Sequence, residues 1–133
     1  MSHLNTDPTQ LEHMSAGNPD DPVVMLNLLR YREQAADGFG VDGKTGREAY
    51  QEYGRRFAEL RPRFGGEPIW MGEAMNTIIG PEAWDIVILV RYPTRRQFVD
   101  MLNDADYQAI APIRAAALED SRLVEMRQLL PGI

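Results

Sequence analysis

Residues 84–92, Trp-Asp-Ile-Val-Ile-Leu-Val-Arg-Tyr, contain the stretch that decides the fold. The five central residues are all Ile, Val or Leu, which is typical of a buried β-strand. Because side chains alternate along a strand, the two isoleucines and Val90 point to one side, while Val87 and Leu89 point to the other. Both faces of the predicted sheet are therefore apolar near its middle, and both need cover.

The segments on either side of this strand predict a succession of strands and helices. Thr45 and Glu48 form a capping box, and large apolar residues follow it every three or four positions, which predicts an amphipathic helix. Pro93 and Thr94 open a second helical region in the same way. The full prediction is, in chain order, a strand at 23–31, a helix at 45–61, a strand at 68–79, a turn at 80–83, a strand at 84–92, helices at 94–103 and 105–119, and a strand at 122–129.

This order predicts an α+β domain with a four-stranded sheet that is mixed but mostly antiparallel. Each strand-helix-strand crossover is right-handed, so both helical regions lie on the same face of the sheet. The other face is also apolar, and a soluble monomer rarely leaves so large an apolar patch exposed. We therefore expect a homodimer in which a second copy covers that face, sheet against sheet.

The chain begins with an arm that differs in composition from the rest. Residues 1–21 predict one short helix, opened by Asp7 and Pro8 and ended by Gly17, and residues 22–133 form a single domain. The arm holds four acidic residues and no Lys or Arg, so it supplies most of the net charge of −6. The nearly neutral domain predicts no binding to nucleic acid or to a membrane. Without a secretory signal or an apolar run of about 18 residues, a cytoplasmic protein is expected.

Several catalytic residue types are scarce. The chain has no cysteine, a single lysine, Lys44, and two histidines, His3 and His13, which both lie in the arm. A metal or haem site that needs imidazole ligands is not expected, and the serines have no histidine partner in the domain. We therefore predict no cofactor, and any acid-base chemistry would use carboxylates, tyrosines or bound water.

Polar residues on otherwise apolar elements form the candidate site. Asn27 interrupts the first strand, while Tyr107 and Arg114 share a helical stripe that brings a phenol and a guanidinium to one cavity edge. A partly buried guanidinium suits a carboxylate, phenolate or enolate ligand. Alternatively, Arg114 pairs with Glu73, Asp85 or a helix end as a structural ion pair, and Asn27 satisfies a backbone group. The candidate ligand-binding residues are Asn27, Tyr53, Arg91, Tyr107 and Arg114, and the candidate bases are Glu73 and Asp85.

Residues 38–45, Gly-Phe-Gly-Val-Asp-Gly-Lys-Thr, fit the phosphate-loop pattern G-x-x-x-x-G-K-[ST]. In such a loop the backbone N–H groups surround phosphates, the lysine adds charge and the hydroxyl binds Mg²⁺. Here residues 32–37 separate the first glycine from the preceding strand, and no later strand ends in an aspartate that would hold the metal. The favoured interpretation is a glycine-rich loop whose Thr45 caps the next helix, and nucleotide binding is the lesser alternative.

Several segments together resemble domain-of-unknown-function family 1330. They are residues 22–30, 45–53, 84–85, 92–94, 98, 106–107 and 114–118, and the similarity runs from about Pro22 to Met126. The resemblance implies a ferredoxin-like βαββαβ protomer that pairs into a dimeric α+β barrel. The family's activity is unassigned, and the wider superfamily includes cofactor-free oxygenases, muconolactone-type isomerases, haem enzymes and simple binding proteins.

These observations lead to two functional hypotheses. In the first, a homodimer binds a small organic anion, which Arg114 holds and Tyr107 and Asn27 orient, with Glu73 or Asp85 as the base of an oxygenase- or isomerase-type reaction. In the second, the protein is a non-enzymatic ligand-binding or interaction protein, and the same residues are structural.

Overall fold

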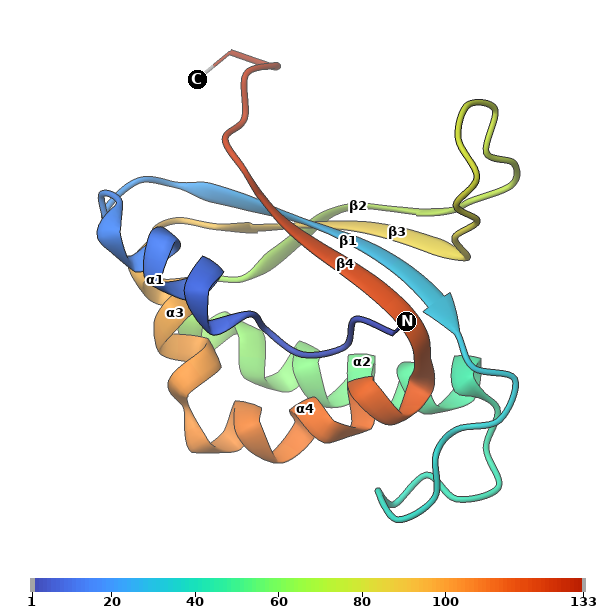
Figure 1. The fold of residues 1–133 in the computed structure, drawn as a ribbon. Helices are drawn as coiled ribbons and strands as arrows, with labels where there is room; N and C mark the ends of the chain where they lie inside the picture. Colours follow the sequence, from blue (N-terminus) through green and yellow to red (C-terminus); the bar gives the residue numbers. More distant parts are fainter. Residues whose placement is uncertain (1, 133) are drawn as a thin grey trace.

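Four strands form one sheet in the computed structural model of the chain, which describes residues 2–132 (Figure 1). They are β1 (Val23–Tyr31), β2 (Glu67–Glu73), β3 (Ile86–Tyr92) and β4 (Leu118–Met126). Their spatial order is β2-β3-β1-β4, and all three neighbouring pairs are antiparallel. The α+β class is confirmed. The expectation of a mixed sheet is wrong, because a third strand separates the two parallel strands that each helical crossover joins.

The helices cover one face of this sheet, as predicted (Figure 1). They are α1 (Pro8–Ala16), α2 (Gly46–Leu60), the short 3₁₀ helix η1 (Arg61–Phe64), α3 (Arg95–Asn103) and α4 (Ala105–Ala117). The capping box of α2 is complete: the Glu48 N–H donates to Thr45 Oγ1 over 3.1 Å, and the Thr45 N–H donates to Glu48 Oε1 over 2.9 Å. Asp7 caps α1, and Thr94 caps α3. None of the described helices is long and apolar enough to cross a membrane.

Two strand boundaries differ from the prediction by four residues or more, while the starts of β2 and β3 and the end of β4 differ by one to three residues. β2 ends at Glu73, and residues 74–85 form one long connection instead of a four-residue turn. Ile78 and Ile79 in this connection are 87% and 92% exposed, since it projects from the sheet on the side away from the helices (Figure 1). β4 begins at Leu118, four residues early, because that side chain is fully buried in the core and pairs with Tyr31 of β1.

The core between the sheet and the helices is divided into two clusters of buried side chains. One surrounds Leu29 and Leu118 and includes the inner faces of α2 and α4. The other surrounds Met25, Tyr92 and Met101, next to α1 and α3. Residues that lie between the clusters, such as Phe57, are only partly buried.

The outer face of the sheet is apolar, as predicted. Leu26 of β1 pairs with Leu89 on one side and with Val124 on the other. Next to this row, Trp70 of β2 is 56% exposed. All the helices lie on the opposite side of the sheet, so no helix covers this face (Figure 1).

Candidate functional site

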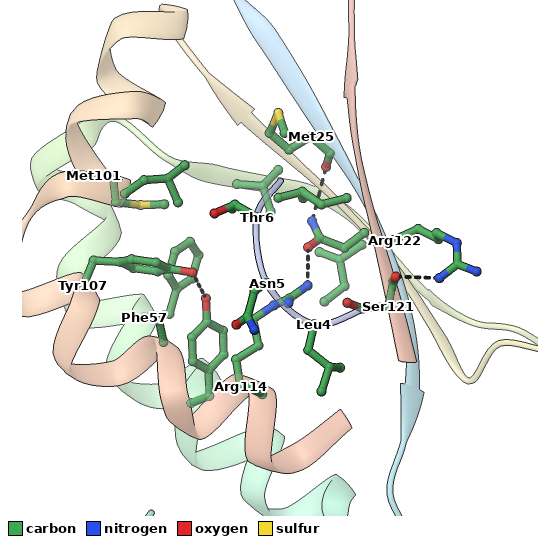
Figure 2. Close-up of a pocket in the computed structure, with 18 of the residues that line it drawn as sticks. Leu4, Asn5, Thr6, Met25, Phe57, Met101, Tyr107, Arg114, Ser121 and Arg122 are labelled. Atoms are coloured by element: carbon green, nitrogen blue, oxygen red, sulfur yellow. Dashed lines mark hydrogen bonds between the residues drawn. The ribbon is translucent and has the colours of Figure 1, made fainter. Parts of the chain in front are cut away.

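A cavity of about 1200 Å³ lies between the inner face of the sheet and the helices α2 and α4 (Figure 2). Ligand cavities in proteins usually measure about 300–1000 Å³, so this one has room for a small organic molecule and water. Its lining is mainly apolar and includes Met25, Phe57, Ile88, Met101 and Leu123. A few polar side chains from β1, α2 and α4 are set among these apolar groups.

Arg114 extends from α4 into this cavity, where Nη2 donates to Asn27 Oδ1 on β1 over 3.4 Å (Figure 2). This contact is at the long limit for a hydrogen bond. Within residues 2–132, no carboxylate lies within ion-pair distance of the Arg114 guanidinium, so the alternative of a structural pair with Glu73 or Asp85 is not observed. The guanidinium therefore keeps most of its donors available to the cavity.

Three tyrosines line the cavity beside Arg114. The hydroxyl oxygens of Tyr53 on α2 and Tyr107 on α4 lie 3.0 Å apart and share a hydrogen bond. Burial raises the pKa of Tyr50 to about 12, although the Arg114 guanidinium acts in the opposite direction. Burial, followed by the neighbouring tyrosines, also raises the pKa of Tyr53 well above its ordinary value. The phenols of Tyr50 and Tyr53 therefore stay protonated at neutral pH and offer hydrogen-bond donors rather than bases.

The other three predicted site residues lie outside the cavity. Glu73 is exposed at the end of β2. Asp85 is also exposed, and its Oδ2 accepts the Tyr31 N–H over 2.8 Å. Arg91 is on the outer face, where it pairs with Glu67 over 3.0 Å. The structure thus brings together Asn27, Tyr53, Tyr107 and Arg114, and it places both candidate bases elsewhere.

The N-terminal arm contributes to the cavity wall, which the sequence interpretation missed. Leu4, Asn5 and Thr6 line the cavity and lie between β4 and the helices (Figure 2). His3 fixes this segment to β4, since its N–H donates to Asp120 Oδ1 over 2.8 Å and its carbonyl accepts from Ser121 Oγ over 2.6 Å. The signal in the sequence is weak: Leu4 is the one large aliphatic residue between Met1 and Asp7, which caps α1.

The sequence of this chain matches the family model "Domain of unknown function (DUF1330)" over residues 44–127. The chain belongs to the DUF1330 family. The match includes Tyr53, Tyr107 and Arg114, while Asn27 lies before it. A protein of unknown function from Rhodopseudomonas palustris is 37% identical in its crystal structure, which covers 98% of this chain and 100% of its own, with a TM-score of 0.90.

More distant structures share only the fold with this DUF1330 protein. A dimeric protein of unknown function and ferredoxin-like fold from Bacteroides fragilis is 15% identical, covers 80% of this chain and 96% of its own, and has a TM-score of 0.55. A hydroxynitrile lyase from Passiflora edulis is 12% identical, covers 85% of this chain and 100% of its own, and has a TM-score of 0.59. No curated protein matches the sequence. The ferredoxin-like fold predicted above is thus confirmed.

The glycine-rich loop of this DUF1330 protein is built as a turn before α2. Gly38, Gly40 and Gly43 have φ angles of 94°, 78° and 78°, which favour glycine. The Gly38 N–H donates to the carboxylate of Asp42 over 2.8 Å, so an acidic group of the loop itself takes the place that a phosphate would need. With the Thr45 hydroxyl engaged in the capping box, the geometry supports the helix-capping interpretation. Across the described residues, no three His, Cys, Asp or Glu side chains come close enough together to hold a metal ion.

Proposed function

We propose that this protein binds a small organic anion in the cavity and that Arg114 holds the anionic group. The observation that supports this most directly is a half-buried guanidinium that has no carboxylate partner among the described residues: its neighbours are two neutral groups, the Asn27 amide at 3.4 Å and the Tyr50 phenol. Removing a charge from water costs several kcal/mol unless a partner compensates for it. A carboxylate that binds the guanidinium through two parallel hydrogen bonds provides this compensation.

Two carboxylates on the cavity wall, Asp7 and Glu125, are engaged by groups other than Arg114. Asp7 accepts the N–H groups of Thr9 and Gln10 at the start of α1. Glu125 forms two hydrogen bonds with Arg95, of 2.8 and 3.0 Å. Because both carboxylates already have local partners, the inner part of the cavity, near Arg114 and the tyrosines, attracts an anion.

The geometry supports binding better than catalysis. A general base must lie within hydrogen-bond reach of its substrate, and neither Glu73 nor Asp85 lines the cavity. The cavity tyrosines with raised pKa values are poor bases at neutral pH. A ligand-binding protein is therefore the proposed function, in preference to a cofactor-independent oxygenase or isomerase.

The binding protein is proposed to work as a homodimer, with a second copy on the outer face of the sheet. The exposed row of Leu26, Leu89 and Val124 supports this, as do the neighbours from Bacteroides fragilis and Thermobifida fusca, both described as dimeric ferredoxin-like proteins. The connection of residues 74–85, which holds the exposed Ile78 and Ile79, projects toward the same side (Figure 1). Sedimentation velocity at micromolar concentration should give a dimer for wild type and for Ala109→Asp, an exposed site on α4. Leu26→Asp should give monomers, and a monomeric wild type would refute the dimer.

Anion binding is tested by thermal shift and calorimetry with matched pairs of neutral and charged ligands. We expect 3-phenylpropanoate to raise the melting temperature of wild type, while its amide does not. Arg114→Met should abolish the effect of the carboxylate, and Arg96→Met, which removes an exposed arginine outside the cavity, should retain it. If a broad set of aliphatic and aromatic carboxylates leaves the melting temperature unchanged, or if Arg114→Met binds them like wild type, the proposal is wrong.

A further inference from the structure

The hydroxyl groups of Tyr53 and Tyr107 meet at the cavity wall, where the dashed line from Tyr107 in Figure 2 marks their contact. The two rings are held firmly in place. Phe57 stacks on the Tyr53 ring with centroids 5.8 Å apart and meets the Tyr107 ring edge-on at 6.4 Å. The position of the hydroxyl pair is therefore set by aromatic packing between α2 and α4.

The pair has one hydrogen more than it uses. Two phenols carry two hydroxyl hydrogens, and the hydrogen bond of 3.0 Å between them takes up one. Among the described residues, no other acceptor forms a hydrogen bond with either hydroxyl. The second hydrogen is therefore available to an acceptor in the cavity.

Helix geometry sets the distance between the tyrosine hydroxyl pair and Arg114. Tyr107 and Arg114 are seven residues apart on α4, so they share one face and their Cα atoms are about 10 Å apart along the axis. Both side chains line the cavity, together with apolar groups such as Phe57 and Met101. The wall thus offers a cationic donor at Arg114, an apolar surface at Phe57 and Met101, and a hydroxyl donor at the tyrosine pair.

We infer that the ligand is a carboxylate with a second oxygen acceptor, a hydroxyl or carbonyl group, at the far end of an apolar body. This inference rests on the proposed anion binding at Arg114. The carboxylate pairs with the guanidinium, the apolar body contacts Phe57 and Met101, and the second oxygen accepts from the tyrosine pair. A site built to form a hydrogen bond discriminates against an analogue that lacks the acceptor.

The test compares two ligands of the same size by titration calorimetry. Wild type should bind 3-(4-hydroxyphenyl)propanoate or its 3-hydroxy isomer roughly fivefold to tenfold more tightly than the corresponding methyl-substituted acid, as one net hydrogen bond allows. Equal affinity for the hydroxyl and methyl acids at both ring positions would overturn the inference. This comparison needs no variant, so it does not depend on how a mutant folds.

Variants then assign the preference to the tyrosine pair. A single Tyr→Phe change leaves one hydroxyl, which is released from the mutual bond and can still donate, so each single variant should keep part of the preference. The double variant Tyr53→Phe with Tyr107→Phe should lose it and bind the methyl acid as wild type does. Tyr31→Phe, a change to another cavity tyrosine, serves as the control and should keep the full preference. A preference that survives in the double variant contradicts the inference.

The two proposals fail in different ways. If neither acid binds wild type, anion binding itself is wrong. If both acids bind through Arg114 with equal affinity, only the inference about the second oxygen is wrong.

Discussion

Replacing Asp120 by Asn is expected to loosen the arm that closes the cavity. The Asp120 carboxylate is 7% exposed and accepts hydrogen bonds from the His3 N–H (2.8 Å), the Ser121 N–H (2.9 Å) and the Arg122 guanidinium (3.0 Å). Burial alone raises the pKa of Asp120, but these hydrogen bonds more than offset it and hold the pKa below its ordinary value. The ionised carboxylate thus fixes the arm to β4, together with the Ser121 hydroxyl that donates to the His3 carbonyl.

The size of the effect follows from the number of charge-assisted bonds. Asn retains one acceptor oxygen but loses the charge, which lowers the contribution of each of the two buried N–H bonds by about 1 kcal/mol. The variant should therefore lose about 2 kcal/mol of unfolding free energy, or about 6–10 °C in melting temperature for a chain of this length. The loss of unfolding free energy cannot exceed the free energy with which the arm docks on β4. Once the arm has detached, water solvates the side chain at position 120. Asp20→Asn, which removes an exposed pair with Arg96, should cost less than about 0.5 kcal/mol.

Urea denaturation at several pH values provides the assay. Since the folded-state pKa of Asp120 lies below the unfolded value of about 3.9, its contribution is complete above that value and is lost as pH falls through the folded pKa. The gap between wild type and Asp120→Asn should be present at pH 7 and shrink below about pH 4. A gap that persists unchanged to pH 2, or no gap at pH 7, would show that the carboxylate does not anchor the arm.

Four further substitutions test the local structure by urea denaturation, and one of them is also tested by calorimetry. A Cβ added at Gly46 would lie 2.5 Å from the Ala117 carbonyl oxygen and closer still to that of Arg32. Gly46→Ala should therefore lower the free energy of unfolding by about 3 kcal/mol. As the control, a Cβ added at Gly54 in the same helix meets nothing within 4 Å, and Gly54→Ala should raise the free energy of unfolding by about 0.5–1 kcal/mol. Thr45→Ala removes the cap of α2 and should cost about 1 kcal/mol. Asn27→Leu should stabilise the protein by about 1 kcal/mol and weaken carboxylate binding in calorimetry; tighter binding would contradict the proposed site.

Most elements could be predicted because local chemistry determines them. Apolar spacing and the Thr45 cap define α2, and the continuous apolar run defines β3, each without reference to the rest of the chain. The ends of β2 and β4 could not be predicted in this way. β2 stops where its pairing with Ile86 ends, and β4 starts early because Leu118 is buried under helices distant in sequence. A strand end thus depends on its partners more than on its own residues.

The candidate site shows the same division between residues that local patterns predict and residues whose surroundings depend on distant segments. Helical spacing placed Tyr107 and Arg114 together, since residues seven apart on α4 share a face. By strand alternation, Asp85, which directly precedes β3, and Arg91 belong to the same face as Val87, but alternation does not say what covers that face. The helices cover the other one, so these two residues lie away from the cavity. The arm was missed because no periodicity links Leu4 to a sheet edge more than a hundred residues later.

Asn27 helps to keep the cavity open between the two core clusters. It points to the helices between two buried neighbours on the same face of β1, Met25 and Leu29, which belong to different core clusters. A leucine there would place apolar volume where Ile88 and Leu123 flank it in the sheet and would help to join the clusters. The polar side chain instead accepts a hydrogen bond from Arg114 and keeps that space open. With a polar residue at this position the chain buries less apolar surface and has a lower free energy of unfolding. We interpret that loss as the consequence of maintaining a binding cavity.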